Sequence, residues 1–165
     1  MLRSLNRFNK QTGISLLEVM LSLSIIAIIL VMATRYFFVA SGNSNVNKLR
    51  GQIGTVVSGL QEYRNQNADY TDLAANGMQT LISDGFVAKT KDVNEAGTTL
   101  YNPWNSPIEV VGTTNSATVT TDLPSATECN AVATGYETAN GTCIAGANGN
   151  SMLKVIVGMV PGTTP

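Results

Sequence analysis

The sequence contains no histidine, and this absence removes a large class of chemistry. Without an imidazole there is no histidine base, nucleophile or metal ligand. A nucleophile and its base would have to be built from lysine or a carboxylate, and no local pattern indicates such a pair. The aspartates Asp69, Asp72, Asp84 and Asp92 do not have the spacing of a calcium loop. We therefore expect no enzymatic activity, no cofactor and no metal site.

Charged residues are also scarce, at 13% of a 165-residue chain whose formal net charge is −1. This balance gives no general attraction to a polyanion, and Lys89 and Lys91 are too few to line a nucleic-acid groove. We expect no nucleic-acid partner. The length is that of one ordinary domain together with an N-terminal segment.

The first 17 residues contain no acid, and the stretch from Val19 to Thr34 contains no charge at all. Arg3, Arg7 and Lys10 all precede this apolar run. Basic residues on one side of an apolar helix favour a cytoplasmic N-terminus, with the rest of the chain exported. Loss of residues 1–13 would change the net charge from −1 to about −4.

There are only two cysteines, Cys129 and Cys143, and both fall in the part expected to be exported. Two cysteines in an oxidising compartment predict one disulfide, worth roughly 3 kcal/mol in the chain-entropy account. The alternative is a pair of unpaired thiols in a cytosolic protein.

A single long helix is predicted from Ile14 to about Asn65. Its first half, to Thr34, is apolar on nearly every side and long enough to cross a membrane. The second half carries an amphipathic stripe with spacings of three and four. Residues 41–45, SGNSN, are poor helix formers, so we expect a bend or local melting near Gly42, with a complete break as the alternative. The stripe consists of Val46, Leu49, Ile53, Val56, Val57, Leu60 and Tyr63.

The remaining sequence predicts a small α+β head. A short helix over Met78–Ser83 precedes a turn-rich corner at residues 102–107, and the segments 108–111 and 117–121 form a hairpin. Ser125 and Glu128 have the spacing of a capping box that starts a second short helix. Residues 152–160 read as a final buried strand, and 133–150 as a loop. The fold class is therefore a long helix packed on a small antiparallel sheet.

Glu18 stands at the head of the apolar run, where a charge is costly to bury. Cleavage after Gly13 would give Ile14 a free ammonium group one helical turn from this carboxylate. The same amine on a neighbouring parallel helix could also neutralise it. Glu18 would then set the axial register between neighbouring chains.

The segment Gly13–Glu18, GISLLE, with the basic residues before it and the apolar helix after it, resembles the type IV pilins and their pilin-like relatives. The resemblance implies cleavage by a prepilin peptidase after Gly13, N-methylation of Ile14, and a role for Glu18 in assembly. It also implies an inner-membrane precursor, the pilus assembly machinery as partner, and a helical homo-oligomeric filament on the bacterial surface.

Several features favour the type IVb branch. The leader is longer than is usual in the type IVa branch, the first mature residue is not phenylalanine, and Arg35 stands where type IVa chains usually have proline. The expected organisation is a basic leader at 1–13, a membrane and filament-core helix at 14–35, its amphipathic continuation at 36–66, and a head at 67–165.

Other interpretations remain open. A conventional signal peptide would be cut after Ala33 or Ala40, and an uncut anchor would hold an unrelated periplasmic binding module. Within the pilin-like class, a type II secretion pseudopilin or a minor pilin shares the same N-terminal signature.

Overall fold

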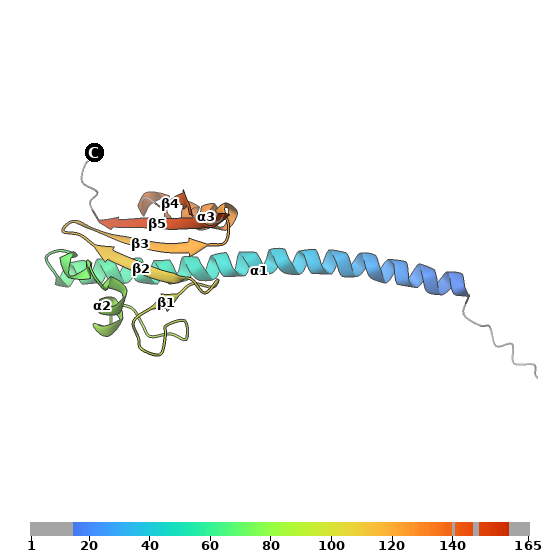
Figure 1. The fold of residues 1–165 in the computed structure, drawn as a ribbon, viewed down its shortest axis with the longest axis horizontal. Coiled ribbons are helices and arrows are strands. Elements are labelled where there is room, and N and C mark those ends of the chain that lie inside the picture. The colour runs from blue at the N-terminus through green and yellow to red at the C-terminus, as the bar shows by residue number, and fades with distance from the viewer. Residues whose placement is uncertain (1–14, 140, 147–148, 159–165) are drawn as a thin grey trace, which may run out of the picture. The chain divides into compact units, whose positions relative to one another are not determined.

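The computed structural model describes residues 15–139, 141–146 and 149–158. Two compact units divide the chain, residues 1–40 and residues 41–165. Helix α1, Leu16–Gln66, contributes its first part to one unit and its second part to the other (Figure 1).

Helix α1 is continuous through residues 41–45. The predicted local melting and the alternative of two separate helices are therefore wrong, whereas a bend at this position stays a prediction. Poor helix formers cost at most about 1 kcal/mol each. Helix propagates through such a segment once turns are formed on both sides of it.

The second part of α1 buries the predicted stripe. Val46, Leu49, Ile53, Val56, Leu60 and Tyr63 are buried in the core of the head, Val57 is half-buried, and Gly59 joins the buried set. A Cβ atom on Gly59 would lie 2.7 Å from the backbone oxygen of Phe86. This glycine therefore permits a close approach of the helix to the following loop.

The described residues of the head form one antiparallel sheet of five strands in the order β1-β2-β3-β5-β4 (Figure 1). The predicted hairpin is confirmed, and so is the final strand as far as Gly158, whereas its last two predicted residues, 159–160, lie outside the described residues. The strands are β1 Leu100–Tyr101, β2 Pro107–Gly112, β3 Ser116–Leu123, β4 Thr142–Ala145 and β5 Ser151–Gly158.

The prediction that residues 133–150 form only a loop is wrong. This segment contains a 3₁₀ helix, η2 (Thr134–Ala139), and the edge strand β4, which pairs with β5 through Cys143 opposite Leu153. Strand β4 has no alternating pattern of its own, and it is bounded by glycine and asparagine. Its neighbour in the sheet and its disulfide hold it in place.

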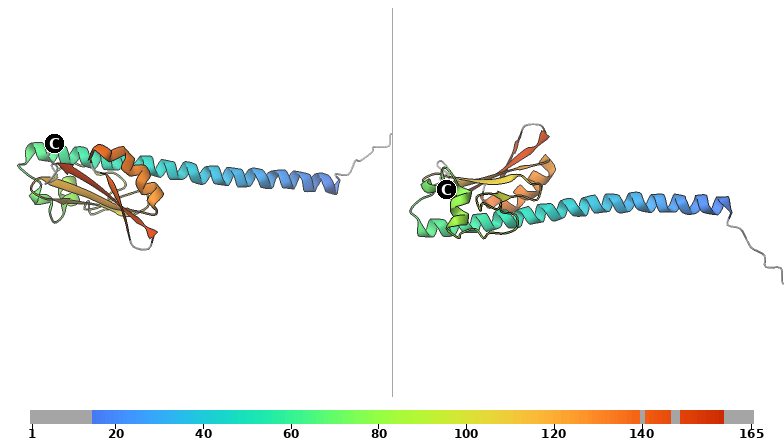
Figure 2. Two further views of the ribbon diagram at one scale, coloured as in Figure 1. Left: turned by 90° about the horizontal axis from the view of Figure 1, so that it is seen from above. Right: turned by 60° about the horizontal axis from the view of Figure 1, so that its bottom comes forward.

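One face of the sheet is buried and the other is not. The second part of α1 and helix α3, Ala126–Ala133, lie on the same side of the sheet in both views of Figure 2. Inward-facing residues of the central strands, such as Val119 and Val155, are almost fully buried there. The opposite face carries Glu109, Asp122 and Met152, which are exposed.

The two short helices follow their predicted signals. Helix α2, Gly77–Ser83, ends at Asp84, and Gly85 after it has a φ of 85°. Ser125 caps α3 by accepting a hydrogen bond from the backbone N–H of Thr127. Glu128 contacts the Ser125 hydroxyl, so the two side chains bond to each other instead of forming the reciprocal backbone bond of a full capping box.

The predicted corner at residues 102–107 is organised by one buried side chain, Asn102. Its amide nitrogen donates to Thr121 Oγ1 (3.0 Å) and to the carbonyl oxygen of Asp122 (2.8 Å). Its amide oxygen accepts from the backbone N–H groups of Trp104 and Ser106, both at 2.9 Å. Trp104 packs half-buried against the core, as expected for a corner residue.

Candidate assembly segment

The first turn of α1 holds the acidic residue of interest. The carbonyl oxygen of Ser15 accepts hydrogen bonds from the backbone N–H groups of Glu18 (2.9 Å) and Val19 (3.2 Å), so Ser15 is the residue from which the helix starts. Glu18 lies in the first turn, and its side chain is exposed. A carboxylate here interacts favourably with the positive end of the helix dipole, by about 0.3–1 kcal/mol when exposed. Because its side chain is exposed, the Glu18 carboxylate remains available for a partner.

The predicted processing residues Gly13 and Ile14 lie outside the described residues, as do the leader bases Arg3, Arg7 and Lys10. Pairing of Glu18 with an Ile14 ammonium group therefore stays a prediction.

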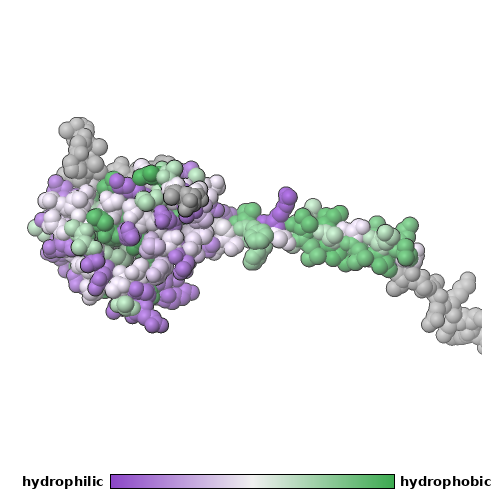
Figure 3. Space-filling view, in the orientation of Figure 1, coloured by the Kyte–Doolittle hydropathy of each residue, from purple (hydrophilic) through white to green (hydrophobic). Residues whose placement is uncertain are grey.

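The first unit presents an apolar helical surface that none of the described residues covers. Leu16 is 78% exposed and Val39 is 64% exposed, with the large apolar side chains between them similarly open. This helix is also the one element among the described residues that is long and apolar enough to cross a membrane. Figure 3 shows the corresponding band of hydrophobic side chains along it. A surface of this kind in water would be strongly unfavourable, so its natural surroundings are lipid or other apolar helices.

The hydroxyl groups in this segment do not disturb its apolar character. Ser22 donates to the carbonyl oxygen of Val19 (2.9 Å) and Ser24 to that of Met20 (2.8 Å). Thr34 donates to the carbonyl oxygen of Leu30 (2.7 Å). Each of these three hydroxyls is satisfied within its own helix, which removes the cost of transferring it unpaired into lipid or into a bundle.

Arg35 is the first charged residue after the apolar run, and it is exposed. It lies 17 residues beyond Glu18 in an unbroken helix. At about 1.5 Å per residue the two charges are separated by roughly 25 Å along the axis. This is close to the thickness of a hydrocarbon core, so each charge can lie near one boundary of it.

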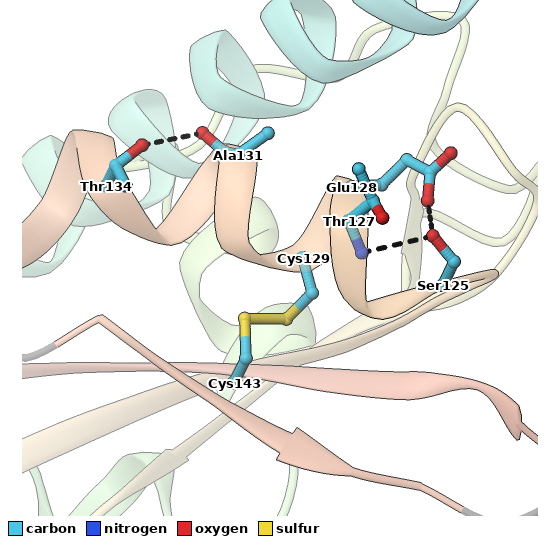
Figure 4. Close-up of a disulfide and its surroundings, with 7 residues drawn as sticks. All are labelled: Ser125, Thr127, Glu128, Cys129, Ala131, Thr134 and Cys143. Carbon is cyan, nitrogen blue, oxygen red and sulfur yellow. Dashed lines mark hydrogen bonds between the residues drawn. A yellow bond between two sulfur atoms is a disulfide. The ribbon is translucent and has the colours of Figure 1, made fainter.

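The predicted disulfide is confirmed. Cys129 on α3 and Cys143 on β4 are bonded, with their Cα atoms 6.0 Å apart (Figure 4). Cys129 is completely buried, and the bond joins the helix to the edge strand across the inner face of the sheet.

Two further residues, which sequence reasoning missed, hold this disulfide-bounded region on α1. The Arg50 guanidinium donates to the carbonyl oxygen of Ala131 and to Thr134 Oγ1 (3.2 Å), at the C-terminal end of α3. The Tyr136 hydroxyl donates to the backbone carbonyl of Arg50. Burial raises the pKa of the Tyr136 phenol, against smaller opposite effects of the Arg50 charge and a hydrogen bond with Gly54. A lone arginine beside the apolar stripe of α1 and a tyrosine in a polar loop gave no signal of this contact.

The described residues contain one ion pair, between Lys48 Nζ on α1 and Asp92 Oδ1 at 2.8 Å. Gln52 donates to Asp92 (3.2 Å) and to the carbonyl oxygen of Tyr101 (3.0 Å), which ties α1 to the loop before β1. Within the described ranges, no three histidine, cysteine or acidic side chains gather in a way that could hold a metal ion.

Comparison with known proteins finds one match. Residues 8–34 match a family model described as the prokaryotic N-terminal methylation motif. Neither the search of curated proteins nor that of solved structures gives a match. The matched segment contains Gly13, Ile14 and Glu18 together with the apolar run that the structure shows as exposed helix. The chain thus carries at its N-terminus the signal of a type IV pilin-like or pseudopilin-type precursor.

Proposed function

We propose that this protein is a structural subunit of a type IV pilus filament, of the type IVb kind, with no catalytic role. The observation that carries the proposal is the combination of the methylation motif at residues 8–34 with the exposed apolar helix from Leu16 to Val39. A helix that is apolar on every side needs lipid before assembly and neighbouring helices after it.

The precursor is held in the inner membrane with its leader in the cytoplasm and its head in the periplasm. Arg3, Arg7 and Lys10 oppose translocation of residues 1–13. The prepilin peptidase cuts after Gly13 and methylates the new N-terminus at Ile14. The proposed cleavage site precedes Leu16, the first residue of α1, in the sequence.

Glu18 acts as the assembly residue. Its carboxylate is exposed in the first turn and adjoins large apolar side chains. An incoming subunit brings an N-terminal ammonium group, and pairing of the two charges recovers part of the roughly 2.5–3.5 kcal/mol that a lone charge costs in a bilayer. Because only one axial offset between parallel helices brings these charges together, the pair sets the stagger of the filament.

The apolar surface of α1 lets a subunit leave the membrane without being exposed to water. Its lipid contacts are exchanged for contacts with neighbouring helices, and hydroxyls such as Ser22 and Thr34 need no new partner during this exchange. The pilus assembly machinery of the inner membrane would carry out the extraction. The finished homo-oligomer has α1 helices at its core and heads at its surface.

The filament would serve adhesion, aggregation, conjugation or DNA uptake. A type II secretion pseudopilin or a minor pilin shares the N-terminal signal, and the disulfide-bounded head mildly favours the pilin.

The test is to shear native cells, collect filaments by ultracentrifugation and identify their subunits. Filaments built mainly of this chain support the proposal. Filaments that contain it only in traces would indicate a minor pilin, and retention in the envelope despite piliated cells would indicate a pseudopilin.

A further inference from the structure

The head has an apolar feature that neither the core nor the assembly segment uses. Within the described residues of the head, three large apolar side chains are exposed: Ile144 (49%), Val111 (47%) and Met152 (37%). All three lie on the sheet face opposite α1 and α3, because their chain neighbours Cys143, Val110 and Leu153 face the other way, toward the core. None of the described residues covers this outer face.

The strand register arranges the outer face in rows. Glu109 on β2 is paired with Thr120 on β3, which is paired with Lys154 on β5. In the next row, Val111 is followed by Thr118 and then Ile156. The acid and the base thus flank β3 in one row, and two apolar side chains flank it in the adjacent row.

This pattern is complementary to itself. Consider a second copy that lies face to face with the first and is related to it by a twofold axis parallel to β3. Strand β2 of each copy then lies opposite strand β5 of the other. Glu109 then lies opposite Lys154 of the second copy, and Val111 lies opposite its Ile156, each twice because of the symmetry. Within the described part of the chain neither Glu109 nor Lys154 has an ion-pair partner. Both charges are therefore available to the second copy.

A third row completes the face. Met152 is paired with Asp122 on β3 and with Ile144 on β4, and Pro107 adjoins Asp122 and Met152 around a shallow depression. The same axis brings Met152 over Pro107 of the second copy. It also brings the two Asp122 carboxylates toward each other at the end of β3. Their repulsion opposes pairing, so removal of the Asp122 charge should strengthen an association that has this geometry.

We propose that this outer face, made of β2, β3 and β5 with β4 at its edge, is a contact surface for a second copy of the chain. Three strands about 4.8 Å apart and roughly 20 Å long offer only about 300 Å² on each partner. This area is well below the roughly 800 Å² per partner of a stable complex. A single pair is therefore weak, and the contact becomes effective when many copies act together.

This inference rests on the proposed filament, because a filament repeats the outer face at every subunit. The outer face is directed away from α1, so in a filament with α1 helices at its core it is directed outward. The partner copy would then belong to a neighbouring filament, and the contact would hold filaments side by side.

The test uses the full-length chain in sheared filaments, mixed from ¹⁴N- and ¹⁵N-labelled cells. A zero-length carbodiimide cross-linker joins a lysine amine to a carboxylate in direct contact. Mixed-isotope cross-linked peptides identify links between chains and separate them from links within one chain. The expected product joins Glu109 to Lys154 between chains, and absence of this product while other interchain links form would overturn the proposal.

Charge exchange provides the matched variants. Glu109→Lys gives a face with two bases and Lys154→Glu a face with two acids, so each variant alone should lose self-association by about tenfold. Mixing the two variants restores opposite charges across the interface. Filaments of one variant labelled with a fluorescent donor and filaments of the other labelled with an acceptor should therefore show energy transfer, whereas donor and acceptor filaments of the same variant should not. Failure of the mixture to recover would contradict face-to-face pairing even if both variants fold.

Two further variants test the geometry. Asp122→Asn removes the like charges on the axis and should strengthen association, whereas Glu95→Gln in the exposed loop before β1 should leave it unchanged. Equal behaviour of the two variants would overturn the twofold arrangement. If Lys154 forms cross-links exclusively to other proteins, the partner of the outer face is not a second copy, and the proposal is overturned. The yield of sheared filaments is measured first for every variant, so that absence of filaments counts against the proposed function, whereas filaments without the contact count against this inference.

Discussion

The backbone oxygen of Phe86 lies 2.7 Å from the position that a Cβ atom on Gly59 would occupy. Gly59 therefore brings the second part of α1 into direct contact with the backbone of the loop after α2. Val87 adjoins the same position at 3.2 Å, and it is buried. A glycine that weakens the helix locally is thus required by the packing of the head.

Gly59→Ala should lower the stability of the head although alanine is the better helix former. The added methyl group must displace backbone, a strain of about 1–3 kcal/mol, which exceeds the propensity gain of up to about 1 kcal/mol. Gly51→Ala is the matched control, because nothing lies within 4 Å of its Cβ position, and it should raise stability. Thermal unfolding of the detergent-solubilised chains measures both. A stabilised Gly59 variant would show that the contact with Phe86 is not rigid.

Reduction of the bond between Cys129 and Cys143 should destabilise the head by about 3 kcal/mol and release the edge strand first. Strand β4 has a single neighbour in the sheet, β5, so its backbone bonds depend on the tether to α3. Hydrogen exchange of residues 142–145 should accelerate far more than that of β3. The double variant Cys129→Ala, Cys143→Ala should behave like the reduced protein. Unchanged protection of β4 after reduction would mean that the ladder alone holds it.

The contact between Tyr136 and Arg50 should give the head a pH-dependent stability at high pH. Burial raises the pKa of Tyr136 in the folded protein above its ordinary value. A raised folded-state pKa contributes stability that is fully present below the unfolded-state pKa, near 10, and is lost as the pH rises through the folded-state pKa.

Tyr136→Phe should therefore cost about 1 kcal/mol at neutral pH, and the difference from the native chain should shrink above about pH 10. The pKa values of Tyr63 and Tyr70 are also raised by burial, so the comparison with the Phe variant isolates Tyr136. Tyr36→Phe, at a 79% exposed position, is the control and should have no effect at either pH. Denaturant titrations at neutral and high pH measure the differences, and one that grows with pH would contradict the sign.

Glu18→Ala should leave cleavage of the leader largely intact and block incorporation into filaments. The cleavage site precedes the helix, whereas the carboxylate is needed for a neighbour's ammonium group. Glu62→Ala removes an exposed carboxylate from the same helix and should assemble normally. Immunoblots of sheared and membrane fractions report both steps. Normal piliation of the Glu18 variant would contradict the proposed role of Glu18 in setting the axial register between subunits.

The elements that sequence patterns predicted are those whose signals are local. The stripe of α1, the hairpin around residues 112–116 and the Ser125 cap each depend on residues within a few positions of one another. Strand β4 was missed because a four-residue edge strand with a mostly exposed pattern is stabilised by its neighbour and its disulfide.

The contacts of Arg50 and Tyr136 were missed because they join residues more than 80 positions apart. In the assembly segment, Glu18 could be identified from the sequence because a charged side chain at the start of an apolar run is costly to bury. The outer face of the sheet required the register between strands, which no single-strand pattern contains.

The most direct test of the account is the intact mass and N-terminal residue of the mature protein, isolated from native membranes or sheared filaments. The account predicts a chain that begins at Ile14, heavier by one methyl group and lighter by two hydrogens for the disulfide. Gly13→Leu should keep the precursor at full length. A chain that begins after Ala33 or Ala40 would contradict the account, since Glu18 and most of the apolar helix would then have been removed with a signal peptide.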